Sequence, residues 1–179
     1  MATTLYFSAT RTPGISPSVK GTWTATTETA VRLMDNAKDG STLANTTIFA
    51  NADIAAAATH LARQFVSRPL AAGIAFVTTD TFKCYVRCME SGSNDNINRN
   101  PIGIFVVSLD GATVRATLKA VGHYGPNTTE WNTSLRNKTF GDGDVFAANY
   151  TTVSGDRLLI EIGGMISSAG GRSERASSV

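Results

Sequence analysis

The chain has few of the residues that most often build reactive sites. Among its 179 residues are only two histidines, His60 and His123, and two cysteines, Cys84 and Cys88. A zinc site on the cysteine pair would need further cysteine or histidine ligands, and nothing in the sequence brings a histidine near it. Four residues apart on a strand, the cysteines would lie about 13 Å from each other, too far for a disulfide. We predict two buried free thiols and no metal site.

Recognisable catalytic motifs are also missing. The sequence contains no G-x-S-x-G elbow, no H-E-x-x-H pair and no phosphate-binding loop. Gly141–Asp144 (GDGD) could offer carboxylates to Ca²⁺, but Asp and Gly are also what tight turns require, and the EF-hand pattern is absent. Glu161 is expected at a solvent-facing strand position and not in an acid–base pair. We predict that the chain is not an enzyme and needs no cofactor.

Charge is scarce and nearly balanced. Charged residues make up 17% of the chain, and the net charge is +2. This balance does not indicate a nucleic-acid partner. No apolar run reaches membrane-spanning length, and Met1–Thr4 lacks the basic region and apolar segment that open a signal peptide. We expect a protein made in a cytoplasm, with neither nucleic acid nor membrane as a partner.

The strongest positive signal is a β-hairpin over Ile102–Val121. Asp110-Gly111 separates two runs rich in β-branched residues and predicts a two-residue type I′ turn, because Asp tolerates positive φ and Gly adopts it freely. Before this turn both alternating sets of residues are apolar, as in a strand covered on both faces. After the turn apolar and polar residues alternate, which predicts a strand with one buried and one solvent-exposed face.

Further short strands are predicted along the chain. The helical signal is weak and confined to Ile54–Ala58, which has high helix propensity but could also be a buried strand. The last predicted strand turns Leu158, Ile160 and Ile162 inward and Arg157 outward, and Gly163-Gly164 ends it. The other strand candidates are Leu5–Phe7, Ala30–Met34 (strand or helical turn), Thr59–Ser67 before Pro69, and the block Gly73–Glu90, in which Phe82, Cys84, Val86 and Cys88 face inward.

Short strands, frequent turns and almost no helical period predict an all-β protein. We expect an antiparallel β-sandwich of the jelly-roll type, with extended terminal arms. An immunoglobulin-like sandwich is the second choice, because its Cys…Trp…Cys signature is absent. The predicted organisation is an N-terminal arm or first short strand over residues 1–19, the sandwich over 20–166 and a flexible tail over 167–179.

One group of residues could contact a ligand or partner. Trp131 and Tyr124, with Tyr85 and Tyr150, could form an aromatic platform for a sugar. The competing interpretation is that Trp131 and Tyr124 close the ends of the core. The polar donors that would accompany the platform are Arg136 and, in the long polar loop before the hairpin, Asn96 and Arg99.

Four segments together resemble the small jelly-roll virion proteins of tailed bacteriophages. The likeness covers roughly residues 59–164 and is one of pattern. It is carried by VSRPLAAG (Val66–Gly73), SLDGATVRATL (Ser108–Leu118), WNTSLRNKTF (Trp131–Phe140) and GDRLLIEIGG (Gly155–Gly164). Proteins of this group decorate or cement capsids or occur in tail appendages, and the resemblance carries no catalytic residues.

The resemblance implies a structural role in the virion. We expect an external capsid decoration or cement subunit that acts as a homo-oligomer, with a trimer as one candidate state, and that binds the major capsid protein or other virion proteins. Residues 1–19 and 167–179 could then reach neighbouring subunits. The competing class is a carbohydrate-binding adhesin module on a tail fibre or a bacterial surface, for which a glycan would be the ligand.

Overall fold

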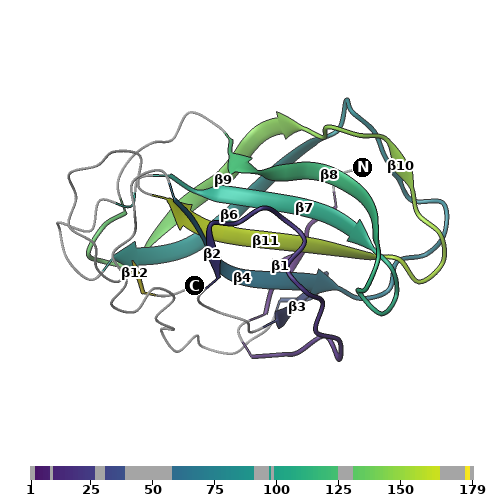
Figure 1. Cartoon of the computed structure of the whole chain (residues 1–179), viewed down its shortest axis with the longest axis horizontal. Coiled ribbons are helices and arrows are strands. Elements are labelled where there is room, and N and C mark those ends of the chain that lie inside the picture. Colours follow the sequence, from purple (N-terminus) through teal and green to yellow (C-terminus); the bar gives the residue numbers. More distant parts are fainter. Residues whose placement is uncertain are drawn as a thin grey trace.

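The structure is a computed structural model that describes residues 3–8, 10–26, 31–38, 58–90, 97, 99–124, 131–165 and 176–177. Within these residues the chain forms strands, turns and loops and no helix (Figure 1). The all-β prediction is therefore confirmed. Of the predicted helical signal Ile54–Ala58, residues 54–57 lie outside the described part of the chain, and Ala58 is buried just before a strand.

The largest sheet has the strand order β1-β3-β4-β11-β7-β8, and β2 also pairs with β4. Strands β2 and β3 run parallel to β4, whereas the remaining pairs are antiparallel, so this sheet is mixed and not wholly antiparallel as predicted. Its strands are β1 (Tyr6–Phe7), β2 (Ala25–Thr26), β3 (Val31–Asp35), β4 (Thr59–Ser67), β7 (Pro101–Val107), β8 (Val114–His123) and β11 (Arg157–Met165).

Two smaller sheets complete the described structure. The first has the order β12-β6-β9, with β6 spanning Thr81–Glu90, β9 spanning Arg136–Val145 and β12 spanning Ala176–Ser177. The second pairs β5 (Ala75–Phe76) with β10 (Tyr150–Thr151). The antiparallel pairs β4·β11, β5·β10, β6·β9 and β7·β8 are nested, and β7 also pairs with β11. The chain from β4 to β11 is thus one long hairpin folded back on itself.

The main core lies between the largest sheet and the β6–β9 pair. Its buried side chains come from both layers, for example Phe65 of β4, Ile104 of β7 and Phe140 of β9. The predicted inward face of β6 is confirmed, since Cys84, Val86 and Cys88 are all buried there while Lys83, Tyr85 and Arg87 are exposed. Packing of one sheet on another through such alternating side chains gives a β-sandwich-like molecule.

A second, smaller core covers the other face of the largest sheet. Val66, Phe105 and Leu159 are buried there, and Ile15 from the N-terminal segment packs against them. The prediction that the strand before the hairpin turn is covered on both faces is therefore confirmed, because every residue of β7 is buried. Figure 1 shows the N-terminal segment crossing this face of the sheet.

Two predicted outward residues of β11 are buried. Glu161 is fully buried and Arg157 is 9% exposed. The prediction was wrong because β11 lies between β4 and β7 at the centre of the sheet, where the N-terminal segment covers the outer face. The strand also continues through Gly163 to Met165 and does not end at the glycine pair. At Gly163 a β-carbon would lie 1.9 Å from the carbonyl oxygen of His60, so the bulged pairing with β4 needs glycine here.

The predicted turn at Gly141–Asp144 is part of strand β9. Gly141 and Gly143 both have positive φ, and the register against β6 shifts beside them. The Gly-Asp repeat therefore encodes a bulged strand and not a chain reversal. Asp142 forms an ion pair with Lys83 across the two strands. Within the described residues, no group of three or more acidic, His or Cys side chains is placed to hold a metal ion.

The predicted hairpin over β7 and β8 is confirmed, but its turn is larger than predicted. The N–H of Gly111 donates to the carbonyl of Ser108, so Leu109 and Asp110 are the central turn residues and the connection spans 108–113. The Asp110 carboxylate accepts hydrogen bonds from the Ser108 hydroxyl at 2.6 Å and the Ala112 N–H at 3.0 Å. Gly111 takes the left-handed conformation, with φ of +76°.

Gly111→Val is expected to destabilise the protein by more than about 1 kcal/mol, because a β-branched residue resists positive φ. A side chain here would also meet Pro17, whose Cβ lies 2.9 Å from the position of a β-carbon. Urea unfolding of the variant and the wild type measures the difference, and Gly143→Val, with positive φ but open space, separates the two causes. An unchanged unfolding midpoint for Gly111→Val would contradict this description of the turn.

Both cysteines are free thiols in the main core. Burial raises the pKa of Cys84 to about 12 and raises the pKa of Cys88 further, although nearby Lys138 lowers the latter in part. Because the thiolate is the reactive form, both should resist a thiol reagent at pH 8 in the folded protein and react after unfolding. Mass spectrometry of the labelled protein counts the modified sites. Rapid labelling of the folded protein at both positions would contradict the assigned strand faces.

Candidate functional site

The predicted contact residue Trp131 lies in the main core. Its side chain is 2% exposed, and its indole N–H donates to the side-chain oxygen of Asn100 at 2.7 Å. Asn100 is also buried and donates through its amide to the carbonyl of Thr139 at 2.9 Å. Of the two interpretations of Trp131, the surface platform is not the one that the structure shows. The competing interpretation, in which it closes the core, describes its place.

The other predicted contact residues do not come together into one site. Tyr124 is half-buried, its hydroxyl donates to the carbonyl of Ala120, and the Lys119 ammonium lies 4.1 Å from its ring centre, where it occupies one ring face. Arg99 is half-buried at an isolated bridge to Met165, and Asn96 lies outside the described residues. Of the predicted set, the described residues with exposed side chains are Arg136 and Tyr85.

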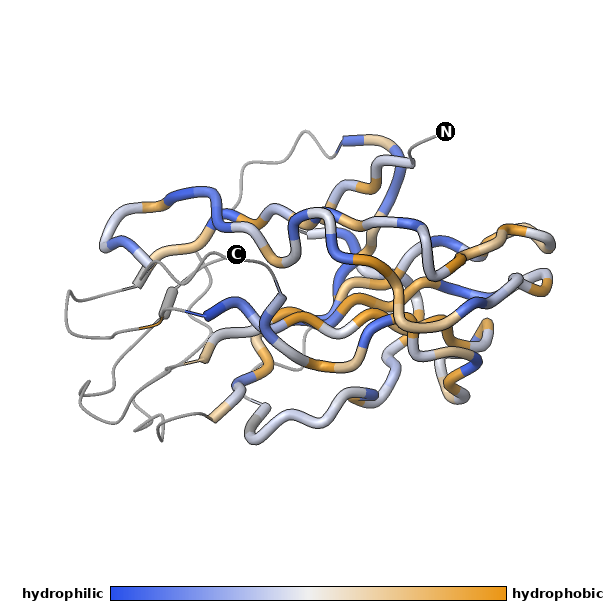
Figure 2. Tube along the Cα trace, turned by 90° about the horizontal axis from the view of Figure 1, so that it is seen from above, coloured by the Kyte–Doolittle hydropathy of each residue, from blue (hydrophilic) through white to orange (hydrophobic). Residues whose placement is uncertain are grey.

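Two exposed surfaces are better candidates for a contact site. The first is at one end of the molecule. We call residues 68–80, 108–113 and 146–156 the loop end. Hydrogen bonds join these loops: Leu70 and Gly155 are linked through backbone groups, and the Arg157 side chain binds the carbonyl of Leu109. Figures 1 and 2 show the loops gathered together, with strongly hydrophobic stretches at several of their tips.

Large aliphatic side chains are exposed at the loop end. Leu109 is 54% exposed and Val153 is 53% exposed, with smaller exposed fractions at Ile74 and Val77. Leu109 contributes to a shallow cleft of about 620 Å³, which is lined by Ile15, Ser108, Leu109, Asp110, Arg115 and Arg157. Sequence reasoning missed this surface because turns are expected to be polar. The signal that could have revealed it is the aliphatic residue inside each turn segment, as in SLDG and TVSGD.

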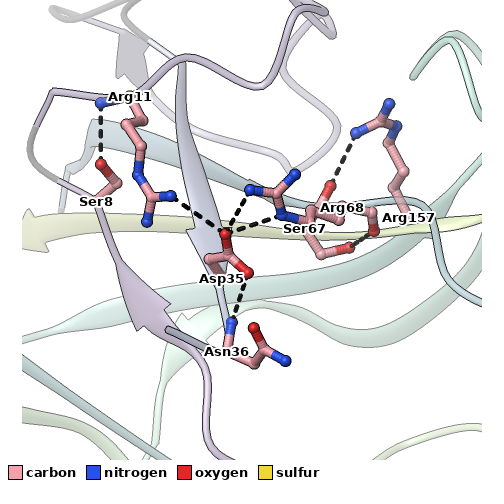
Figure 3. Close-up of polar contacts among 7 residues, drawn as sticks. All are labelled: Ser8, Arg11, Asp35, Asn36, Ser67, Arg68 and Arg157. Atoms are coloured by element: carbon pink, nitrogen blue, oxygen red, sulfur yellow. Dashed lines mark hydrogen bonds and ion pairs between the residues drawn. The ribbon is translucent and has the colours of Figure 1, made fainter. Parts of the chain in front are cut away.

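Ionic contacts fix the strand ends beneath these loops. The Asp35 carboxylate at the end of β3 accepts from Arg11 at 3.3 Å and from the Nε of Arg68 at 2.9 Å, as Figure 3 shows. It also accepts from the N–H of Asn36. The hydrogen bond from Arg68 is the largest of the effects that hold the pKa of Asp35 below its usual value, against an opposing effect of burial. This contact ties the N-terminal segment, β3 and the end of β4 together.

Arg157 supports the loop end from below. Its Nε donates to the carbonyl of Leu109 at 2.9 Å. Its Nη1 donates to the carbonyl of Ser67, also at 2.9 Å (Figure 3). Burial lowers the pKa of this guanidinium. The adjacent Asp156 is also buried, and its carboxylate accepts from the hydroxyl of Tyr150 at 2.7 Å and the N–H of Val153 at 2.9 Å. The exposed aliphatic side chains are therefore carried on loops with defined internal contacts.

The second surface is the outward side of strands β6 and β9, which we call the open face. Tyr85 is 56% exposed there, and Arg87 lies two residues along the same strand, directly opposite Asn137 of β9. A shallow cleft of about 310 Å³ is lined by Arg87, Leu135, Arg136 and Asn137. The predicted residue Arg136 lines this cleft, although it pairs with the inward-facing Cys88 of β6. The face is polar, in contrast to the central strands of the largest sheet, which are covered on both sides.

Comparisons with known proteins do not identify the chain. No family model matches it, no curated protein matches it, and no solved structure matches it. Among the described residues there is no helix with the length and apolarity needed to cross a membrane. The functional argument therefore depends on the fold and on the two exposed surfaces.

Proposed function

We propose that the chain is a structural protein of a bacteriophage particle, most simply a decoration or cement subunit on the outside of the capsid. The observation that carries this proposal is the loop end. Leu109 and Val153 each expose more than half of their side chains to solvent. Large apolar side chains exposed together at one end of a molecule mark protein contact sites, and loops held by internal bonds lose little conformational freedom when they dock.

The strand pairing supports the jelly-roll part of the proposal. In a jelly roll, one long antiparallel hairpin is rolled up so that its strands form two sheets. The nested pairs β4·β11, β5·β10, β6·β9 and β7·β8, with the additional pair β7·β11, follow that pattern. We propose a reduced jelly roll in which the β7–β8 turn is the innermost connection.

The proposed partners are the major capsid protein or another virion protein, and further copies of the chain. A homo-oligomer, for example a trimer, would present several loop ends to one particle and raise the avidity of attachment. The described part of residues 1–19 packs on the chain's own sheet, and Ala176–Ser177 pair with β6. The proposed attachment therefore uses the loop end as its main contact and does not require an extended arm.

Purified phage particles test this proposal. Mass spectrometry should find the chain in the particles in a fixed ratio to the major capsid protein, and antibody labelling in the electron microscope should place it on the head. Its absence from particles would contradict a virion role. Labelling confined to tail fibres would favour the adhesin alternative.

The adhesin alternative now depends on different residues from those that suggested it. The platform predicted from Trp131 and Tyr124 is not formed at the surface, since Trp131 is in the core and Lys119 occupies one face of Tyr124. What favours a glycan ligand is the exposed ring of Tyr85 on the open face.

A further inference from the structure

We propose that the contact between His123 and Asn100 is an acid-sensitive switch, which holds the two layers of the sandwich together at the end away from the loop end. While the imidazole is neutral, it accepts the backbone N–H of Asn100. Protonation of the ring breaks this hydrogen bond and loosens the contacts that Asn100 makes to the other layer. The inference does not rest on the proposed attachment to a capsid, because that attachment uses the loop end.

Asn100 joins the two layers. It directly precedes β7 of the largest sheet and is fully buried. Its amide donates to the carbonyl of Thr139 of β9 at 2.9 Å, and its side-chain oxygen accepts from the indole of Trp131 at 2.7 Å. His123 supplies the acceptor for its backbone N–H. A shift of the Asn100 backbone would therefore disturb its contacts to both Trp131 and β9.

The hydrogen bond determines which form of the imidazole fits. His123 is the last residue of β8, which begins beside the loop end at Val114, and it pairs with Pro101 of β7. Its Nδ1 accepts from the N–H of Asn100 at 3.1 Å. A ring nitrogen that accepts carries no proton, so the proton of the neutral ring is on Nε2. A second proton can be added only at Nδ1, where it would point at another N–H.

The other ring nitrogen gives no compensation. Nε2 is buried and has no hydrogen-bond partner in the described part of the chain. The imidazolium would therefore place one N–H against a donor and leave the other without an acceptor. Turning the ring over about its Cβ–Cγ bond would put a carbon in the place of Nδ1, so it cannot restore the bond. The ring or the backbone of Asn100 must move when the proton is added.

The charges around the ring do not reverse this preference. Burial is the largest of the effects that hold the pKa of His123 below its ordinary value, and the guanidinium of Arg99 acts in the same direction. The carboxylate of Asp144 on β9 acts against them. Among the described residues, these two are the charged groups that act on the imidazole. The net effect favours the neutral ring, in agreement with the geometry.

The direction of the pH dependence follows. In the opened chain the imidazole of His123 is in water, so it takes up a proton at a higher pH than it does in the folded protein. This end should therefore be most stable above the ordinary histidine pKa of about 6.5 and lose stability as the pH falls below it, until the folded form is protonated as well. Within that window opening takes up one proton and becomes roughly tenfold easier for each pH unit.

Hydrogen exchange at single sites, measured by NMR on the full chain, tests the switch. The reporters are the amide of Asn100 and the indole N–H of Trp131, and their protection factors are compared between pH 7.5 and pH 5.0. We expect both factors to fall roughly tenfold for each pH unit within the window. Single-site measurement is needed because His60 is also buried and burial lowers its pKa, so global unfolding would combine the two histidines.

Two substitutions separate the proton from the hydrogen bond. His123→Asn places an amide oxygen as far along the side chain as Nδ1, so it can accept the N–H of Asn100 but does not titrate. Its protection should match the wild type at pH 7.5 and should not fall with pH. His123→Ala removes the acceptor, so protection of the Asn100 amide should be at least tenfold lower already at pH 7.5. Titration of the imidazole C–H signals of the wild type measures the pKa of His123 without any variant.

Three results would overturn the inference. The first is that protection of Asn100 and Trp131 in the wild type does not change with pH. The second is that His123→Asn loses protection with falling pH as steeply as the wild type does. The third is that the pKa of His123 lies at or above the ordinary histidine value, which would mean that the ring donates to the backbone of Asn100 and fits in its charged form.

Discussion

Replacing Glu161 with alanine should destabilise the protein by roughly 3–5 kcal/mol, the largest effect that we expect from a single polar residue. This carboxylate is fully buried in the centre of the largest sheet. One oxygen accepts from the N–H of Lys20 at 2.7 Å and the amide of Gln64 at 2.9 Å. The other accepts from the N–H of Gly21 at 2.9 Å and the indole of Trp23 at 2.7 Å.

The expected loss has two parts. Removing the carboxylate leaves four donors without their acceptor, and each unsatisfied buried donor costs about 1–3 kcal/mol when water cannot replace the partner. Three of the donors belong to residues 20–23, so the same change also releases the segment that covers the second core. The two effects overlap, which is why the total is smaller than the sum of four separate losses.

Urea unfolding of the Glu161→Ala variant measures this effect, with limited proteolysis near residue 20 as a second measurement. Glu161→Gln keeps the size but replaces one acceptor oxygen with a donor, so an intermediate loss of about 2 kcal/mol is expected. Asp142→Ala removes an exposed acid that pairs with Lys83 and should cost less than about 1 kcal/mol. If Glu161→Ala unfolds at the same urea concentration as Asp142→Ala, the carboxylate does not anchor the N-terminal segment.

The second large effect is expected for Trp131→Ala, which should cost roughly 3–5 kcal/mol. The substitution empties a large volume in the main core and leaves the side-chain oxygen of Asn100 without the indole donor. Trp131→Phe should recover part of the loss, because it refills the volume but not the hydrogen bond. Thermal and urea unfolding give both values.

Tyr124→Ala is the matched control for Trp131→Ala. Its hydroxyl bond to Ala120 is exposed and its ring is half-buried, so a loss of about 1–2 kcal/mol is expected. If Trp131→Ala folded with wild-type stability but lost a measurable glycan, the surface-platform interpretation would be restored.

The parts of the fold that the sequence predicted were those determined by neighbouring residues. Apolar residues at both parities mark β7 as a strand covered on both faces, and alternation in β6 places Cys84 and Cys88 inward, as the structure shows. The β7–β8 hairpin was predicted because Asp110-Gly111 interrupts two β-branched runs. These signals depend on adjacent residues and not on distant contacts, so the predictions based on them agree with the folded structure.

The errors came from contacts between distant segments. The alternation of apolar and polar residues along β11 predicts that Glu161 faces solvent. The N-terminal segment, about 140 positions away, covers this side of the strand and buries the carboxylate. Gly141–Asp144 has the composition of a turn, but pairing with β6 makes it a bulged strand. Trp131 gives no local sign of whether it closes the core or faces water, because its burial depends on Asn100 and the packed sheets.

The candidate site was predicted only in part. Arg136 was identified and lines the cleft beside Arg87, but its place next to Arg87 requires the β6–β9 register, which no short-range signal contains. The loop end is assembled from three connections far apart in the sequence. Its exposed aliphatic residues therefore lie at one end of the molecule only after folding brings Leu109 and Val153 there.

The most direct test of the proposed role is an occupancy measurement on particles that lack the chain. Purified protein is added to such particles and the bound amount is measured against concentration. The double variant Leu109→Ser, Val153→Ser should need at least tenfold more protein for half occupancy, because it removes apolar area from the proposed contact. Tyr85→Ser, which removes an equally exposed side chain from the open face, should bind as the wild type does. Equal half-saturation of the double variant and the wild type would contradict attachment through the loop end.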